Sequence, residues 1–119
     1  MIATMLAEAR TRIRRYTPHE ALDAGALLVD TRSSDDRRRD GVIPGSIHVP
    51  LSVLEWRADQ TSGYANPELA DRTLVVVCTH GYSSSLAADR LVALGIDAGD
   101  LDGGFEAWRD AGLPVVDAP

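Results

Sequence analysis

Lysine is absent from this chain and cysteine occurs only once. All twelve basic residues are therefore arginine, and the formal net charge of −6 argues against a nucleic-acid partner. A single cysteine cannot close an internal disulfide, form a Cys-x-x-Cys redox pair or build a cysteine-rich zinc site. This cysteine usage fits a reducing compartment, so we expect a cytoplasmic protein.

Long hydrophobic runs are also absent. No stretch approaches the length of a membrane span, and the first residues lack the basic start and apolar core of a signal peptide. We therefore expect no membrane partner. The 119 residues, of which 45% are hydrophobic, suffice for one compact domain. We predict a single domain over residues 1–119, with residues 1–15 as a helical extension at its N-terminus.

Short apolar runs alternate with helical patterns along the chain, which is typical of an α/β fold with a parallel sheet covered on both faces. Strands are predicted at residues 27–30, 47–49, 73–78 and 100–101. Helices are predicted at residues 3–13, 18–25, 85–94 and 105–109, with a loop or short helix at 33–41. The clearest helix start is a capping box, in which Thr17 precedes Pro18 and Glu20.

The lone cysteine, Cys78, ends the apolar run that predicts the third strand, and a loop of small and polar residues follows at 79–84. Ligands of open α/β sheets bind at the carboxyl ends of strands. Backbone N–H groups in such a loop favour an anion and lower the pKa of a thiol. A buried, inert cysteine is the alternative, but the glycine and hydroxyl residues of the loop favour a reactive thiol. Leu86, Leu91 and Leu94 give the next helix an apolar side, which we expect to face the sheet.

Two clusters of arginine, at residues 10–15 and 37–39, are interpreted as solvated faces. A docking patch for a partner is a second interpretation of residues 37–39, because they lie in a predicted loop. The histidines are too few and too widely spaced to indicate a metal site, and we assign no role to His19 or His48.

Four motifs, taken in order, resemble those of single-domain rhodanese-like proteins, the thiosulfate sulfurtransferase type. They are Leu28-Val29-Asp30-Thr31-Arg32, Ile43-Pro44-Gly45-Ser46-Ile47, Val75-Val76-Val77-Cys78-Thr79-His80-Gly81-Tyr82-Ser83-Ser84 and Asp102-Gly103-Gly104-Phe105-Glu106-Ala107-Trp108, with Gly112-Leu113-Pro114 closing the last. The similarity spans roughly residues 16–115. It implies a sheet of about five parallel strands with flanking helices.

The resemblance also implies sulfurtransferase chemistry without a cofactor or a metal. Cys78 would take the outer sulfur of a small donor, thiosulfate or a persulfide, and hold it as its own persulfide. The sulfur would then pass to cyanide, a thiol or a protein acceptor. The substrate-binding loop would comprise Thr79, His80, Gly81, Tyr82, Ser83 and Ser84. The identity of the donor and acceptor, the pathway and the oligomeric state do not follow from the sequence.

Within this loop, Gly81 allows the tight curl because glycine tolerates positive φ. Ser83, Ser84 and Ser85 have two possible roles, which are to donate hydrogen bonds to the sulfur or to cap the following helix. His80 has two as well: it supplies charge or a proton at the site, or it faces solvent without a role.

The loop departs from the family pattern Cys-x-x-Gly-x-Arg-Ser at Ser83, where many members have arginine. Arginine offers a fixed charge and a fork that suits an oxyanion. Weak thiosulfate activity is therefore expected, with a persulfide or a partner protein as the physiological donor. His80 and Arg32 are the candidates to compensate for the missing charge.

Other residues support the predicted site. Asp30 and Arg32 match the Asp-x-Arg that follows a strand in the family. For Asp30 we favour a structural role, and for Arg32 both a structural role and a positive potential beside the pocket stay open. Trp56, Arg57 and Tyr82 are candidates for the pocket mouth.

Three other functions compete with this prediction. A cysteine phosphatase or arsenate reductase needs a Cys-x5-Arg loop, and the arginine position of that loop holds Ser84. A non-catalytic or regulatory module of the same fold, acting as a persulfide carrier or binding module, is favoured by the missing arginine and disfavoured by the intact Cys78. A peroxide-sensing thiol would form a sulfenic acid instead.

Overall fold

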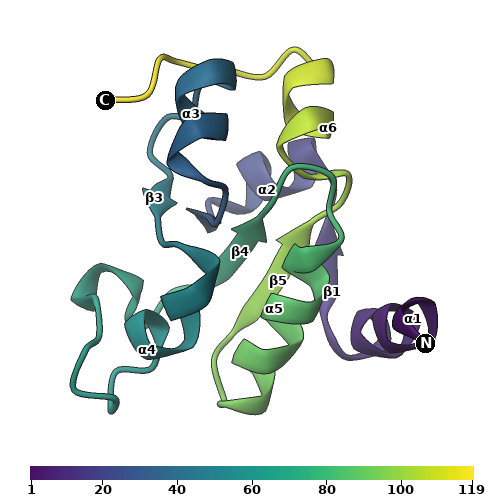
Figure 1. Cartoon of the computed structure of the whole chain (residues 1–119), viewed down its shortest axis with the longest axis vertical. Helices are drawn as coiled ribbons and strands as arrows, with labels where there is room; N and C mark the ends of the chain where they lie inside the picture. The colour runs from purple at the N-terminus through teal and green to yellow at the C-terminus, as the bar shows by residue number, and fades with distance from the viewer.

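Five parallel strands form the central sheet of this computed structural model, which describes all 119 residues. The strands are β1 (Arg14–Tyr16), β2 (Leu27–Asp30), β3 (Ile47–His48), β4 (Leu74–Val77) and β5 (Ala98–Leu101). Their order across the sheet is β1-β5-β4-β2-β3, and every neighbouring pair is parallel (Figure 1). Every residue of β2 and β4 is buried, as expected for central strands of a sheet covered on both faces.

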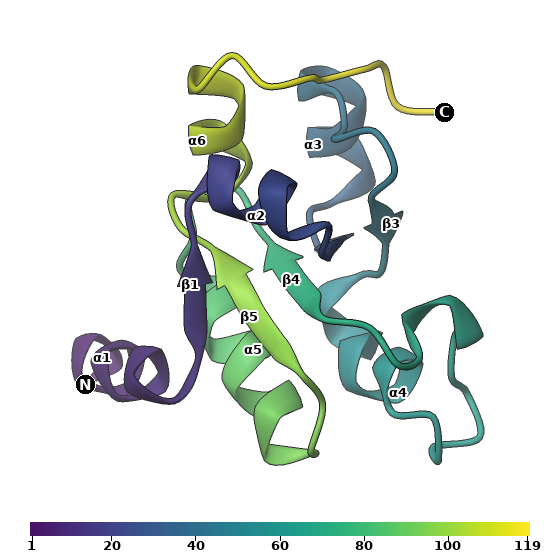
Figure 2. The same cartoon turned by 180° about the vertical axis from the view of Figure 1, so that it is seen from behind.

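Six α-helices and two short 3₁₀ turns surround the sheet. The helices are α1 (Ile2–Arg12), α2 (Pro18–Ala24), α3 (Ser34–Asp40), α4 (Leu54–Ala58), α5 (Ser83–Ala93) and α6 (Gly104–Asp110), and the turns span Leu51–Val53 and Pro67–Leu69. Helices α4 and α5 pack on one face of the sheet, with α1 against α5, while α2 and α6 cover the other face (Figures 1 and 2). This architecture confirms the predicted α/β fold. None of the helices is long and apolar enough to cross a bilayer.

The alternation of side chains along the strands builds two cores, one on each face. Val29 and Val76 point into the core shared with α4 and α5. Val75 and Val77 point into the other, with Trp108 of α6. Because neighbouring residues of a strand face opposite ways, a short run of valines serves both layers and holds the strand end below Cys78 in place.

The capping box at the start of α2 is confirmed. Thr17 Oγ1 accepts a hydrogen bond from the Glu20 N–H at 3.2 Å, and the Glu20 carboxylate accepts one from the Thr17 N–H at 2.9 Å. The helix ends at Gly25, whose φ of 63° is left-handed, at the residue where the sequence places its end.

Two details differ from the prediction. Strand β1 was not expected, because three residues that include two arginines carry no strand signal of their own; the segment becomes a strand by pairing with the edge of β5. Leu94 does not face the sheet, because α5 ends at Ala93 and Leu94 is its exposed C-cap. The buried side of α5 starts instead with two serines, Ser84 and Ser85.

Candidate active site

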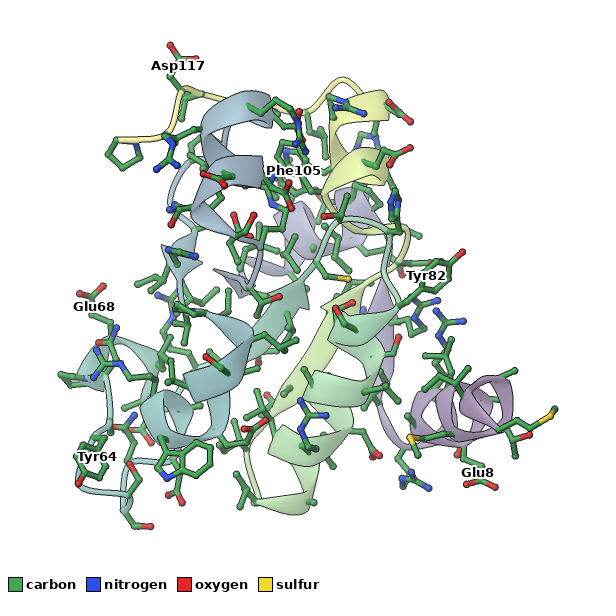
Figure 3. The ribbon with its side chains drawn as sticks, viewed as in Figure 1. Glu8, Tyr64, Glu68, Tyr82, Phe105 and Asp117 are labelled. Carbon is green, nitrogen blue, oxygen red and sulfur yellow. The ribbon has the colours of Figure 1, made fainter.

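Cys78 directly follows the central strand β4, and the loop at residues 79–82 joins it to α5. Cys78 is only 7% exposed, yet it borders a surface pocket of about 280 Å³. The other lining residues are Thr31, Arg32, Thr79, His80, Tyr82 and Ser83. Tyr82 is largely exposed and projects from the loop above α1 in the view of Figure 3. Trp56 and Arg57, expected at the pocket mouth, lie on α4 and do not line this pocket.

The sulfur of Cys78 lies among hydrogen-bond donors. The Gly81 N–H donates to Sγ at 3.1 Å and the Ser84 N–H at 3.4 Å, and the Ser84 hydroxyl oxygen lies 3.2 Å from Sγ. Burial raises the pKa of the thiol, but the hydroxyls of Ser84 and Ser83 and the two amides more than offset it, so the pKa lies below its ordinary value. The site therefore favours a thiolate.

The first turn of α6 supports the loop from outside by binding two of its carbonyls. The Phe105 N–H donates to the Cys78 carbonyl at 2.8 Å, and the Glu106 N–H donates to the Thr79 carbonyl at 3.1 Å. Gly104 makes this approach possible: its φ is 65°, and a Cβ there would lie 2.6 Å from the Thr79 oxygen. The Gly103-Gly104 motif at the start of α6 is thus part of the loop's support.

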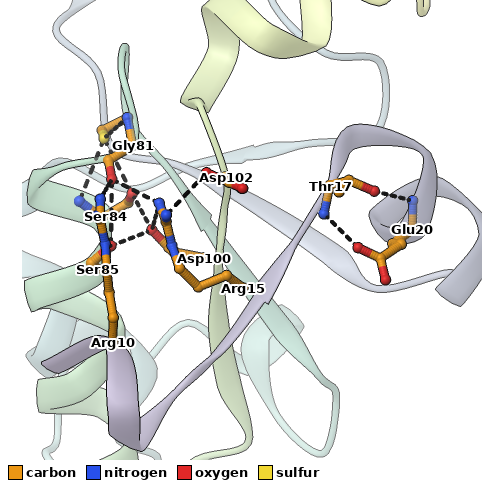
Figure 4. A network of polar contacts seen from close by, with 10 residues as sticks. Arg10, Arg15, Thr17, Glu20, Gly81, Ser84, Ser85, Asp100 and Asp102 are labelled. Carbon is orange, nitrogen blue, oxygen red and sulfur yellow. Dashed lines mark hydrogen bonds and ion pairs between the residues drawn. The ribbon is translucent and has the colours of Figure 1, made fainter. Parts of the chain in front are cut away.

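Two arginines bind a further loop carbonyl, that of Gly81. Arg10 Nη2 on α1 donates to it at 2.8 Å and Arg15 Nη2 on β1 at 2.9 Å (Figure 4). The interpretation of residues 10–15 as a solvated face is therefore wrong for these two side chains. The reason is tertiary: α1 packs on α5 and β1 pairs with β5, which brings both guanidinium groups beneath the loop.

A buried carboxylate, Asp100 on β5, continues the network. It is completely buried, and its Oδ2 accepts hydrogen bonds from the hydroxyls of Ser84 at 2.8 Å and Ser85 at 2.7 Å. Arg15 Nε pairs with its Oδ1 at 3.0 Å. Asp100 is not among the predicted site residues, although an aspartate inside a predicted strand is a signal that a partner lies nearby.

Ser84 stands between Cys78 and Asp100 and has a single hydroxyl proton. When it donates to the Asp100 carboxylate, its oxygen accepts the thiol proton. When Cys78 is a thiolate, the same hydroxyl turns to donate to the sulfur. None of the three serines caps α5 through its side chain, because the N-cap of α5 is Tyr82. Of the two roles left open for these serines, contact with the sulfur is the one Ser84 has, while Ser85 binds Asp100.

Asp30 and Arg32 form a buried pair beside the pocket. The Asp30 carboxylate accepts hydrogen bonds from Arg32 Nε at 3.1 Å and Nη2 at 2.9 Å, and Arg37 Nε lies 3.3 Å away. The guanidinium of Arg32 also binds the Gly41 carbonyl and stacks 3.7 Å from the centre of the Phe105 ring. These contacts tie the β2 loop down. Arg32 Nη1 is buried and has no hydrogen-bond partner in the protein.

His80 lies at the exposed edge of the loop. Its Nδ1 is 2.8 Å from the Glu106 carboxylate on α6, and both side chains are exposed to solvent. The contact adds a third tie between the loop and α6. It also places a titratable pair next to the pocket that Cys78 borders.

Fold and site together define an α/β protein with one thiol at the end of a central parallel strand, inside a loop of inward-facing amides. The model of the rhodanese-like domain family matches residues 17–111, so the chain belongs to this family. The resemblance noted in the sequence is confirmed.

Three similar proteins illustrate the range of the family's relatives. Thiosulfate sulfurtransferase GlpE of Pseudomonas savastanoi is 38% identical over 104 residues, covering 83% of this chain and 90% of that protein. An HTH-type transcriptional regulator of Mycobacterium tuberculosis is 33% identical over 118 residues, covering 95% of this chain and 48% of the regulator. A solved structure from Rhodopseudomonas palustris, described as a protein of unknown function and possible tyrosine phosphatase, has a TM-score of 0.90 and 35% identity, covering 98% and 94% of the two chains.

Proposed function

We propose that this protein is a rhodanese-type sulfurtransferase in which Cys78 carries a sulfane sulfur as a persulfide. Family membership and the GlpE relative support the general activity. The observation that carries the proposal is the sulfur itself, which receives two amide hydrogen bonds and a hydroxyl contact at 3.1–3.4 Å next to an open pocket. A lone thiol in a reducing, cytoplasmic setting would stay free for this chemistry.

In the first half-reaction, the Cys78 thiolate attacks the outer sulfur of the donor. A bond forms between Sγ and that sulfur while the donor's own bond to it breaks, and the electron pair leaves with the donor remnant. With thiosulfate the remnant is sulfite, and with a persulfide it is a thiolate. Total charge is conserved, and the negative charge now lies on the outer sulfur of the Cys78 persulfide.

In the second half-reaction, a nucleophile such as cyanide, a thiolate or a cysteine of a protein acceptor attacks the outer sulfur. The bond to Sγ breaks and its electron pair returns to Cys78, which is again a thiolate. The amides of Gly81 and Ser84 serve both steps, since they stabilise negative charge on sulfur before and after transfer. Two separate half-reactions predict ping-pong kinetics.

The donor is the finer question. Ser83 supplies no positive charge, so the loop lacks the guanidinium that many family members have at this position to bind a doubly charged oxyanion such as thiosulfate. A persulfide donor has a single negative charge on its reacting group and needs less positive charge at the site. We therefore propose a persulfide or a partner protein as the physiological donor, with weak thiosulfate turnover.

Two of the competing functions keep a specific observation in their favour. The Rhodopseudomonas relative is described as a possible phosphatase, but here the position six residues after Cys78 holds Ser84, whose neutral hydroxyl cannot replace the arginine of a phosphatase loop. The mycobacterial relative is a regulator about twice the length of the match, which supports a regulatory persulfide module as the second candidate.

Mass spectrometry of the intact protein separates these functions. The protein is incubated with thiosulfate, glutathione persulfide or cysteine persulfide, and the expected result is a gain of one sulfur atom that is absent from Cys78→Ser. Loaded protein is then given cyanide or a thiol; release of the sulfur with turnover indicates the transferase, and loading without release to any acceptor indicates the regulatory module. Failure to load from every donor overturns both persulfide functions and leaves only a binding module. Hydrolysis of an aryl phosphate would favour the phosphatase.

A further inference from the structure

We infer that the N-terminal segment, residues 1–16, is a working part of the sulfur site, in which Arg10 and Arg15 are positioning residues for the loop amides. The inference rests on the proposed function of Cys78. The segment contributes α1 and β1 and lies outside residues 17–111, the part that the family model matches. The hydrogen bonds of Arg10 and Arg15 to the Gly81 carbonyl, which we call the arginine clamp, are therefore an addition to the matched part of the domain.

The clamp acts on the peptide between Gly81 and Tyr82. Two guanidinium groups hold its carbonyl, at 2.8 Å and 2.9 Å. The chain has no cis peptide bond, and in a trans peptide the carbonyl and the following N–H point in opposite directions. Holding the Gly81 oxygen therefore fixes the Tyr82 N–H on the side away from the arginines.

This Tyr82 N–H donates to no protein acceptor, whereas the N–H groups of Gly81 and Ser84 both reach Sγ. A free donor between two sulfur-binding amides, with Tyr82 itself lining the pocket, is available to the outer sulfur of a persulfide. The arginine clamp thus prepares a position for the second sulfur, the atom that the site must hold and release.

Arg10 and Arg15 differ in how their charge is balanced. Arg15 pairs with Asp100 at 3.0 Å and Asp102 at 2.9 Å. Arg10 has no carboxylate partner: its remaining contacts are the Ser85 hydroxyl at 3.1 Å and the Tyr82 ring, whose centre is 5.9 Å from its guanidinium carbon. Arg10 therefore brings a positive charge without an ion-pair partner to the back of the loop, where it favours a thiolate or persulfide anion in front.

Charged groups surround the Cys78 loop on several elements. They are Arg10 and Arg15 from α1 and β1, Asp100 from β5, Arg32 from the β2 loop, and the pair His80 and Glu106 from the active loop and α6. A useful substitution must change one of these and leave the others in place. Arg10 meets this requirement, because removing it breaks no ion pair.

The chain offers a matched control on the same helix. Arg12 of α1 binds Asp89 of α5 through two hydrogen bonds of 2.8 Å, without touching the loop. Arg10→Met and Arg12→Met each remove one guanidinium contact between the N-terminal segment and α5. The pKa of Cys78 is measured for wild type and both variants from the pH dependence of alkylation by iodoacetamide.

Arg10→Met is expected to raise the pKa of Cys78 and so to slow alkylation at a pH below that pKa, with a tenfold loss of thiolate for each unit of the increase. Arg12→Met is expected to leave it unchanged. Arg10→Lys, which keeps the charge but not the fork, should fall between Arg10→Met and wild type. If Arg10→Met and Arg12→Met both lower the thermal midpoint but Arg10→Met leaves the pKa of Cys78 unchanged, Arg10 has only a structural role and the inference is overturned.

Alkylation needs no sulfur loading, so this test is independent of the proposed activity. If wild type fails to load sulfur but Arg10→Met shifts the pKa, the proposed function fails and the clamp stands. If Arg10→Met is too unstable to titrate, Arg10→Lys decides: a pKa of Cys78 equal to that of wild type refutes the clamp.

Discussion

Replacing Ser84 by alanine removes a hydroxyl that lies 3.2 Å from the Cys78 sulfur and 2.8 Å from the Asp100 carboxylate. In the thiol form, this hydroxyl donates to Asp100 and accepts the thiol proton. In the thiolate form it turns and donates to the sulfur, and Asp100 keeps its bonds to Ser85 and Arg15. The substitution therefore removes a donor from the charged form of the nucleophile.

The expected change in the pKa of Cys78 follows from the switch of the Ser84 hydrogen bond from Asp100 to the sulfur. A hydrogen bond to a charged group contributes about 1.5–3 kcal/mol, and turning toward the sulfur gives up part of the bond to Asp100. A net loss of about 1.4 kcal/mol raises the pKa of Cys78 by about one unit. Ser84→Ala should thus alkylate about ten times more slowly than wild type at a pH below both pKa values.

A companion substitution tests whether the Ser84 hydroxyl donates its proton to Asp100 or to the Cys78 sulfur. In Asp100→Asn, an amide N–H can donate to the Ser84 oxygen, which frees the Ser84 proton for the sulfur and lowers the pKa of Cys78. In the Ser84→Ala background the same change should have a smaller effect, since only the altered charge remains. The assay is alkylation by iodoacetamide as a function of pH. A pKa for Ser84→Ala at or below that of wild type would refute the account of the hydroxyl.

Further predictions concern the loop and the fold. Ser83→Arg should raise thiosulfate turnover in steady-state assays, and no gain would count against a role for the missing charge. Gly81→Ala should destabilise the protein by about 1–3 kcal/mol in urea denaturation, because φ is 84° and the new Cβ would lie 2.8 Å from the Gly103 nitrogen. Folding lowers the pKa of Cys78, so the stability of wild type relative to Cys78→Ala should increase as the pH rises toward about 8.5, the pKa of the thiol in the unfolded chain. This added stability should be lost as the pH falls through the pKa of the folded protein. Equal differences in unfolding free energy between the two proteins at pH 6 and pH 9 would contradict the prediction. Thr17→Ala should cost about 1 kcal/mol of stability and leave the alkylation rate of Cys78 unchanged.

Local signals made much of the fold predictable. The capping box at Thr17, the buried strands at 27–30 and 73–78 and the lone thiol at a strand end are all carried by neighbouring residues. The sulfur site needed more than this. The bond between Arg15 and Asp100 joins residues 85 positions apart, and no pattern near either residue indicates the other. The arginines at 10–15 likewise resemble a solvated face until β1 pairs with β5.

The loop that holds Cys78 is anchored to both ends of the chain, through Arg10 and Arg15 on one side and through Phe105 and Glu106 of α6 on the other. Cys78 precedes α6 in the sequence, so it leaves the ribosome first. Until α6 has emerged and folded, the carbonyls of Cys78 and Thr79 lack their partners on that helix. We therefore expect the loop around the thiol to reach its final form only after α6 has packed against it.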